Sequence, residues 1–263
     1  MTTFGQIATY LDDVLQIREI PDYDDALNGV QCSHVGPVRR IAAAVDFSLP
    51  SIQQTVQEGA NLLIVHHGMF WGGPRAWTGI PYERMRLLIA HDVAVYSAHL
   101  PLDLHPEFGN NALLARELGL VPEAGFGRFR TVDVGCRGSA DIATQDLLAR
   151  VRAFAEPLGS SVICTSHDAA RWTRRWAVLT GAGASTATLR EAADHGVDTL
   201  IVGEGPHHSG VEAIERDIAV IYAGHYATET LGVRSLAAAV SDAFALPWFF
   251  VPAHATGSPS DSG

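Results

Sequence analysis

Two adjacent histidines, His66 and His67, end a run of Leu, Ile and Val that begins after Asn61. The apolar residues do not alternate with polar ones, a pattern typical of a strand buried on both faces in a parallel sheet. Ligands bind at the carboxyl ends of strands in open α/β sheets, so these histidines occur where a site is expected. Two imidazoles there can act as metal ligands, as a proton-transfer pair, or simply as the polar end of a strand.

A second chemically suggestive pair, His225 and Glu229, follows another apolar run through Gly224. If His225 lies in the first turn of a helix, the two side chains share one face. An imidazole and a carboxylate on one face form a chelating pair for Zn, Fe or Mn. An isolated pair at this spacing would instead indicate a solvent-exposed helix contact, so the metal interpretation requires further ligands.

An internal repeat supplies those ligands. Residues 58–68 align without a gap with residues 195–205. The flanking strands match as well, residues 40–45 and 92–95 in the first half with residues 175–180 and 217–220 in the second. With one inserted residue, His99 aligns with His225 and Asp103 aligns with Glu229. Short α/β segments resemble one another by chance, but the matched His-x-x-x-carboxylate is harder to explain in that way.

The candidate metal ligands all follow predicted strands, and they are His66, His67, Asp103, His225 and Glu229. This is more than one open catalytic zinc needs, since such a site usually takes three protein ligands. The set suits two metals that share a carboxylate or a water. We therefore expect two divalent metal ions per chain, and mixed His/carboxylate ligation admits Zn, Fe, Mn or Ni.

Two further residues are candidate catalytic groups, His99 and Glu204. His99 can be a sixth ligand, a hydrogen-bond donor that supports the ligands, or a proton carrier, and the supporting role is favoured. Glu204 aligns with His67 and would face the same cleft, where it could orient a water or a ligating histidine. A role at a helix start explains Glu204 equally well. Either residue could shuttle protons.

Three other stretches leave alternatives open. His207 and His208 are either surface histidines or the rim of a pocket. Residues 181–185 lie between a strand and a helix, where backbone N–H groups can hold an anion. They lack the Lys-Ser/Thr of a P-loop, and a tight turn with Ser185 as helix N-cap explains them better. The aromatic, glycine-rich residues 68–74 could roof a pocket.

The apolar patterns predict an α/β fold of two similar halves with mainly parallel sheets and a metal site between them. The first half takes residues 1–120, followed by a Gly- and Arg-rich connector over 121–174, the second half over 175–254 and a disordered tail over 255–263. Helices are predicted at 4–17, after Ser48 or Ser51, and at 82–90, 111–120, 146–154, 189–195, 211–216 and 227–244. Further strands are predicted at 161–165, 199–202, 218–223 and 248–251.

Composition restricts the protein class. No apolar run reaches the roughly 18 residues of a membrane span, and the N-terminus lacks a secretion-signal pattern. A net charge of −11 disfavours nucleic-acid binding, which needs basic patches. Cys32, Cys136 and Cys164 are scattered and without CxxC spacing, which indicates a reducing cytoplasm and argues against a disulfide framework.

Four motifs occur together in order: Ile64–Trp71, Ala98-His99-x-x-x-Asp103, Gly203-Glu204-x-x-His207-His208 and Ala223–Thr230. In this combination the chain resembles the GTP cyclohydrolase I type 2 homolog family, also called dinuclear metal-centre hexameric or Ngg1-interacting-factor-like proteins. The likeness runs from about Arg40 to Val240, and the segment His-Tyr-Ala-Thr-Glu-Thr is its most specific part.

The resemblance implies metal ligands at the same residues and a toroidal homohexamer whose metal sites face an internal cavity. Some relatives carry a large extra domain between the halves, for which residues 121–174 leave no room. The Trp often seen upstream of residues 27–31 is absent here, which does not affect the metal residues.

Two functions are compatible with these ligands. The first is a dinuclear metallohydrolase, in which one metal activates a water and the other holds a carbonyl, amidine or phosphate oxygen. Its small-molecule substrate is open, and GTP is one candidate through the resemblance. The second is a non-catalytic metal-binding hexameric scaffold, a metallochaperone or a regulatory interaction protein. An open metal position with an exchangeable water would favour the first.

Overall fold

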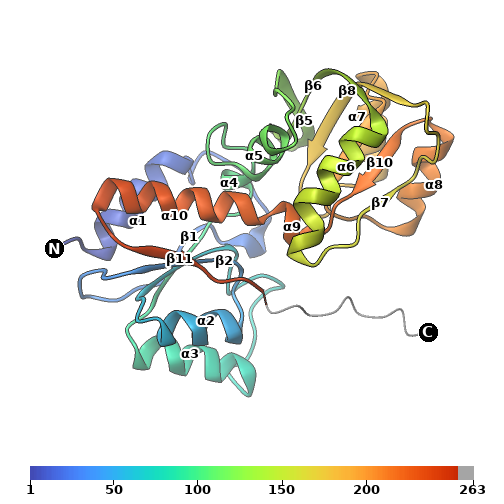
Figure 1. The fold of residues 1–263 in the computed structure, drawn as a ribbon. Coiled ribbons are helices and arrows are strands. Elements are labelled where there is room, and N and C mark those ends of the chain that lie inside the picture. Colours follow the sequence, from blue (N-terminus) through green and yellow to red (C-terminus); the bar gives the residue numbers. More distant parts are fainter. Residues whose placement is uncertain (254–263) are drawn as a thin grey trace. The chain divides into compact units, whose positions relative to one another are not determined.

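The computed structural model describes residues 1–253, which form two compact units. Unit 1 comprises residues 1–102 and 233–253, and unit 2 comprises residues 103–232. Each unit contains one sheet with helices packed on it, so the predicted α/β fold of two halves is confirmed (Figure 1). The tail predicted for 255–263 lies outside the described residues.

Unit 1 has a five-stranded sheet in which four strands are parallel. In spatial order the strands are β1 (Gly29–Cys32), β4 (Ala94–Ser97), β3 (Leu62–His67), β2 (Ile41–Asp46) and β11 (Trp248–Phe250). β1 is antiparallel to β4 and was not predicted. β3 is almost wholly buried, as its continuous apolar run predicted. Register pairs Asp46 with His67, so both residues lie at the carboxyl edge of the sheet.

Helices cover both faces of this sheet. Figure 1 shows α2 and α3 on one face and α1 and α10 on the other. Their bounds are α1 (Phe4–Leu15), α2 (Leu49–Gln57), α3 (Ile80–Ala90) and α10 (Thr230–Phe244), with a short η1 (Asp24–Ala26) and α4 (Leu100–Asp103). α2 begins because the Ser48 side chain accepts a hydrogen bond from Ser51 N and Pro50 stands in its first turn.

Unit 2 has a six-stranded mixed sheet. In spatial order the strands are β5 (Ala124–Phe129), β6 (Val132–Ala143), β8 (Trp172–Leu179), β9 (Thr199–Val202), β10 (Ala219–Tyr222) and β7 (Ile163–Cys164). The helices are α5 (Asn110–Glu117), α6 (Thr144–Ala155), α7 (Thr186–Asp194), α8 (His207–Glu215) and α9 (His225–Thr228), with a short η2 (Glu156–Leu158). Trp176 packs into the core with α5 and α6, and its neighbour Ala177 into the core with α7 and α8.

The topology supports the internal duplication. β2, β3 and β4 are adjacent and parallel, with β3 in the middle, and β8, β9 and β10 repeat that arrangement around β9. In both sheets the third strand of the repeat also pairs antiparallel with a short strand, β1 or β7. The strands that carry or precede the candidate ligands are therefore equivalent in the two units.

The segment predicted as a connector has a different structure. Its residues form the β5–β6 hairpin, α6 and β7, all within unit 2. The glycines that suggested a linker instead allow strands to pack closely. A Cβ on Gly135 would lie 2.3 Å from Val178 O, and one on Gly138 would lie 2.6 Å from Val121 O. Glycine enrichment here reflects tight packing rather than flexibility.

The predicted boundaries of the halves also differ from the structure. α5, assigned to the first half, belongs to unit 2 because Leu114 and Leu118 pack in the core that contains Trp176. The final strand, assigned to the second half, is β11, which pairs parallel with β2 in unit 1. The order of elements along the chain did not indicate that α5 belongs to unit 2 or that β11 belongs to unit 1. Within residues 1–253, no helix is long and apolar enough to cross a membrane.

Candidate functional site

Three histidines gather at the carboxyl edge of the unit 1 sheet. His66 and His67 end β3, and His99 follows β4 by two residues. β3 and β4 are parallel neighbours, so their carboxyl ends are adjacent. One ring nitrogen of each histidine lies within 4.8 Å of the others. The structure thus brings His99 into the same group as the two predicted ligands.

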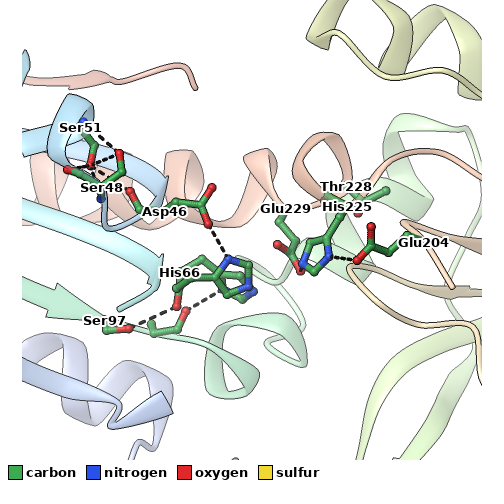
Figure 2. Close-up of polar contacts among 11 residues, drawn as sticks. Asp46, Ser48, Ser51, His66, Ser97, Glu204, His225, Thr228 and Glu229 are labelled. Atoms are coloured by element: carbon green, nitrogen blue, oxygen red, sulfur yellow. Dashed lines mark hydrogen bonds and ion pairs between the residues drawn. The ribbon is translucent and has the colours of Figure 1, made fainter. Parts of the chain in front are cut away.

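Each of these rings makes a hydrogen bond through Nδ1 to an oxygen. His66 bonds to Ala98 O at 2.8 Å, His67 to Asp46 Oδ1 at 2.9 Å, and His99 to Asp22 Oδ1 at 2.8 Å. Figure 2 labels Asp46, which holds His67, and His66, which bonds to the Ala98 carbonyl. An acceptor at Nδ1 keeps the proton of the neutral ring there and leaves the lone pair on Nε2. Metal-ligating histidines are commonly oriented by such an oxygen.

Asp22 is held in place by several donors. It accepts hydrogen bonds from His99, from Asn28 Nδ2 at 2.7 Å and from Leu100 N at 2.9 Å. Burial raises the pKa of Asp22, but its hydrogen bonds to His99 and Asn28 and the charge of His99 outweigh burial and hold that pKa below its ordinary value. Asp22 is therefore an anion that fixes the His99 ring.

Sequence reasoning did not assign roles to Asp22 or Asp46. Asp46 could have been found, because it ends the strand beside β3 and so reaches the same sheet edge as His67. Asp22 lies in a loop that was identified only as acidic, and no spacing links it to His99.

Aromatic side chains lie against two of the three histidines, His67 and His99. The Trp71 ring centroid lies 4.5 Å from that of His99 and 5.2 Å from that of His67. Tyr23 packs edge-on against Trp71 at 6.2 Å. The loop that carries Trp71 is pinned by Gln31, whose Oε1 accepts from Met69 N at 2.6 Å. The glycine-rich loop thus places Trp71 beside His67 and His99.

In unit 2 the predicted pair His225 and Glu229 is in contact. His225 opens α9, and its Nε2 lies 3.1 Å from Glu229 Oε1. Its Nδ1 bonds to Glu204 Oε1 at 2.9 Å (Figure 2). The Glu229 side chain is only 3% exposed, whereas that of Glu204 is 60% exposed. The imidazole therefore lies between one buried and one exposed carboxylate.

Two glycines make space for this pair. A Cβ on Gly181 would lie 2.2 Å from Glu229 Oε1 and 3.4 Å from His225 Nε2. A Cβ on Gly203 would lie 2.9 Å from His225 Cα. Any side chain at Gly181 would therefore occupy the space beside both donor atoms. Residues 181–185 serve this close approach and a turn, because the Ser185 side chain caps α7 by accepting from Thr188 N.

Asp103 is anchored separately. Its Oδ1 accepts from Asn110 Nδ2 at 2.8 Å, and its backbone oxygen accepts from Asn111 Nδ2 at 3.2 Å. Among the described residues, Asp103 is not part of a group of three close ligand atoms.

His207 and His208 lie in the first turn of α8, and both are exposed. Of the two alternatives for these residues, their exposure favours surface histidines.

The donor sets fit a divalent transition metal. Unit 1 offers the imidazoles of His66, His67 and His99. Unit 2 offers the imidazole of His225 and the buried carboxylate of Glu229, and Gly181 leaves space beside their ligand atoms. Imidazole and carboxylate are the ligand types that Zn, Fe, Mn and Ni accept in proteins. The predicted metal-binding character is thus supported by His and Glu groups that could hold metal.

The charge state of His225 generates a pH prediction for the metal-free protein. Burial lowers the pKa of His225, but the hydrogen bonds and charges of Glu229 and Glu204 outweigh burial and raise that pKa from 6.5 to about 9. A raised pKa means that the stabilisation is complete below pH 6.5 and disappears as the pH rises through about 9. Chelated wild-type protein should therefore lose more unfolding free energy between these pH values than His225→Gln.

Denaturant unfolding at a series of pH values measures this difference. His208→Gln is the matched control, since its exposed ring belongs to neither group of candidate ligands, and it should follow the wild type. Parallel pH profiles for the wild type and His225→Gln would contradict the assignment.

Comparison with known proteins places the chain in a family. The sequence model of Duf34/NIF3 (NGG1p interacting factor 3) matches residues 2–256. A "GTP cyclohydrolase 1 type 2 homolog" of Deinococcus radiodurans is 41% identical over 94% of this chain and 91% of its own, and one of Halobacterium salinarum is 43% identical over 85% and 88%. The crystal structure of TTHA1606 from Thermus thermophilus has a TM-score of 0.84 and 35% identity over 97% of this chain and 100% of its own. The resemblance seen in the sequence is confirmed, and the chain belongs to the Duf34/NIF3 family.

Proposed function

We propose that the protein binds two divalent metal ions through His66, His67, Asp103, His225 and Glu229 and acts as a metal-dependent hydrolase. The observation that carries the metal assignment is the support given to the imidazoles. His66, His67 and His225 each bond through Nδ1 to a carbonyl or carboxylate oxygen. This arrangement orients a histidine whose Nε2 is to serve as a ligand.

Bound metal would supply a water of lowered pKa and a Lewis acid for an oxygen of the substrate. The chain's own contribution is orientation and proton handling. Asp22 holds Nδ1–H of His99, so the His99 Nε2 can accept or release a proton near the histidine group. Glu204 bonds to His225, which supports a role in orienting that ligand rather than in carrying protons.

The substrate class is proposed from the relatives. Curated relatives are named GTP cyclohydrolase 1 type 2 homologs, which makes GTP one candidate among small molecules with a hydrolysable carbonyl, amidine or phosphate group. The alternative is a non-catalytic metal-binding scaffold, a metallochaperone or a regulatory interaction protein. The same ligands would serve either function.

Metal content tests the ligand assignment. Protein purified without chelator or added metal should contain about two ions per chain by elemental analysis. His225→Ala or Glu229→Ala should lose most of one ion, because each removes a direct ligand. Asp46→Ala and Glu204→Ala, which remove only the support of an imidazole, should weaken metal affinity by about 10–100-fold.

His207→Ala is the control and should retain both ions, since His207 is exposed and outside the ligand groups. Folding of each variant is checked by circular dichroism. If folded Glu229→Ala keeps its full metal content, Glu229 is not the ligating carboxylate.

Turnover tests the catalytic part. The metallated protein is screened against nucleotides, phosphoesters and cyclic amides, and chelation should abolish any activity. His99→Ala should lower turnover by about 10²–10⁴-fold, the usual contribution of a general acid or base, while leaving metal content close to normal. If no substrate turns over faster than with Asp103→Ala, the scaffold function is the better account.

A homohexamer is part of the proposal. It follows the family resemblance and is supported by exposed apolar side chains on α3, where Tyr82 is 51% and Ile89 66% exposed. The aromatic strand β11 contributes less to this argument, because Arg40 covers Phe249 and Arg234 covers Phe250.

Sedimentation velocity should detect a stable oligomer at micromolar concentration, with a mass of about six chains if the family resemblance holds. Tyr82→Glu together with Ile89→Glu should weaken association if α3 forms part of the contact. A stable monomer in the wild type would contradict the proposed oligomer.

A cytoplasmic location completes the proposal. Cys32, Cys136 and Cys164 are free thiols, which is consistent with a reducing compartment.

A further inference from the structure

A pocket of about 270 Å³ lies within unit 1 beside the histidine group. Its walls come from the ends of β2 and β3, from the loop after β3 and from the first turns of α3. Asp46 and His67 line this pocket, and so does Trp71, whose ring lies against His67 and His99. A molecule in the pocket would therefore reach the candidate ligand His67.

Two arginines in the pocket wall, Arg75 and Arg84, have no acidic partner among residues 1–253. Arg84 Nε is buried and lacks a hydrogen-bond partner there, and its guanidinium lies 5.5 Å above the Phe47 ring. The neighbouring Glu83 is engaged by Arg86 at 2.9 Å. Leaving a buried donor unsatisfied costs free energy that an anion in the pocket would recover.

The two positive charges also act on each other. Burial lowers the pKa of Arg84, and the charge of Arg75 lowers it further. Two like charges in the wall of one pocket repel, and an oxyanion that contacts both would replace this repulsion by charge-assisted hydrogen bonds. Arginine suits this task because its planar fork matches carboxylate and phosphate oxygens.

The rest of the wall is aromatic and apolar. Trp71 is 39% exposed and Trp77 is 63% exposed, and both line the pocket with Phe70 and Met85. Large exposed tryptophans offer flat faces on which a ring can stack. The volume is just below the roughly 300–1,000 Å³ of common small-molecule sites, which limits the occupant to about one ring system with one charged group.

We propose that this pocket binds an organic anion with a single flat ring system, whose oxyanion group contacts Arg75 and Arg84 and whose ring packs against Trp71 and Trp77. The inference rests on the proposed function, since it identifies the substrate class of the same site. Phosphate and carboxylate share the required chemistry, so both belong to the test.

Isothermal titration calorimetry of the chelated full-length protein tests binding without metal. The probes are 2-naphthyl phosphate, 2-naphthoate, uncharged 2-naphthol and ringless inorganic phosphate. One or both ring anions should bind saturably, and naphthol and inorganic phosphate should each bind at least about 10-fold more weakly, because each lacks one of the two contacts.

The arginine variants locate the anion contact. Arg75→Gln and Arg84→Gln should each weaken ring-anion binding by about 10-fold or more, as expected for loss of a hydrogen bond to a charged group. Arg86→Gln is the matched control, since Arg86 lies on α3 with Arg84 but pairs with Glu83 and does not line the pocket. This variant should bind the ring anions as the wild type does. If Arg84→Gln does not fold, the exposed Arg75 still carries the test.

Absence of saturable binding to the chelated wild type, or equal affinity in the folded Arg75→Gln and Arg84→Gln proteins, would overturn the pocket assignment. This outcome is independent of the metal proposal. Two ions per chain in the protein as purified, without ring-anion binding, would reject the pocket alone. Ring-anion binding by a protein that contains no metal when purified without chelator would support the pocket and reject the metallohydrolase.

Discussion

The candidate site depends on one repeated interaction, a hydrogen bond from a histidine Nδ1 to an oxygen. It occurs at His66, His67, His99 and His225, with a carbonyl in one case and carboxylates in three. Each bond fixes the direction of the ring, and at His66, His67 and His99 it also fixes the nitrogen that keeps the lone pair. Without this support, adjacent histidines would be mobile polar side chains at a strand end rather than an ordered set of donors.

Parallel strand order supplies most of these oxygens. Asp46 ends β2 beside β3, Ala98 follows β4 on the other side of β3, and Glu204 follows β9 beside β10. A parallel sheet collects the carboxyl ends of adjacent strands at one edge, so ligand and support arrive together. Asp22 is the exception, since it comes from a loop and is placed by Asn28 and the backbone of Leu100.

The parallel strand arrangement also explains which elements could be predicted from the sequence. Buried parallel strands have continuous apolar runs, which made β3, β9 and the duplication visible. The β5–β6 hairpin was missed because its glycines mark close strand packing, which composition alone does not distinguish from a linker. The position of β11 beside β2, and the contact of Asp22 with His99, depend on long-range packing that leaves no local pattern.

The duplication conserves positions while changing what they do. His67 and Glu204 are equivalent in the repeat, yet His67 is held by Asp46, whereas Glu204 itself holds His225. The equivalent of Asp46 is Gly181, whose missing side chain leaves space beside Glu229 and His225. At one repeat position, unit 1 thus has a candidate metal ligand, His67, and unit 2 has a carboxylate that orients a candidate ligand, Glu204. Because Gly181 has no side chain, the space beside His225 and Glu229 stays open. The two units therefore offer unlike candidate ligand sets. The hydrogen bond from His225 to Glu204 favours a role for Glu204 in orienting His225 over a role as a second proton carrier.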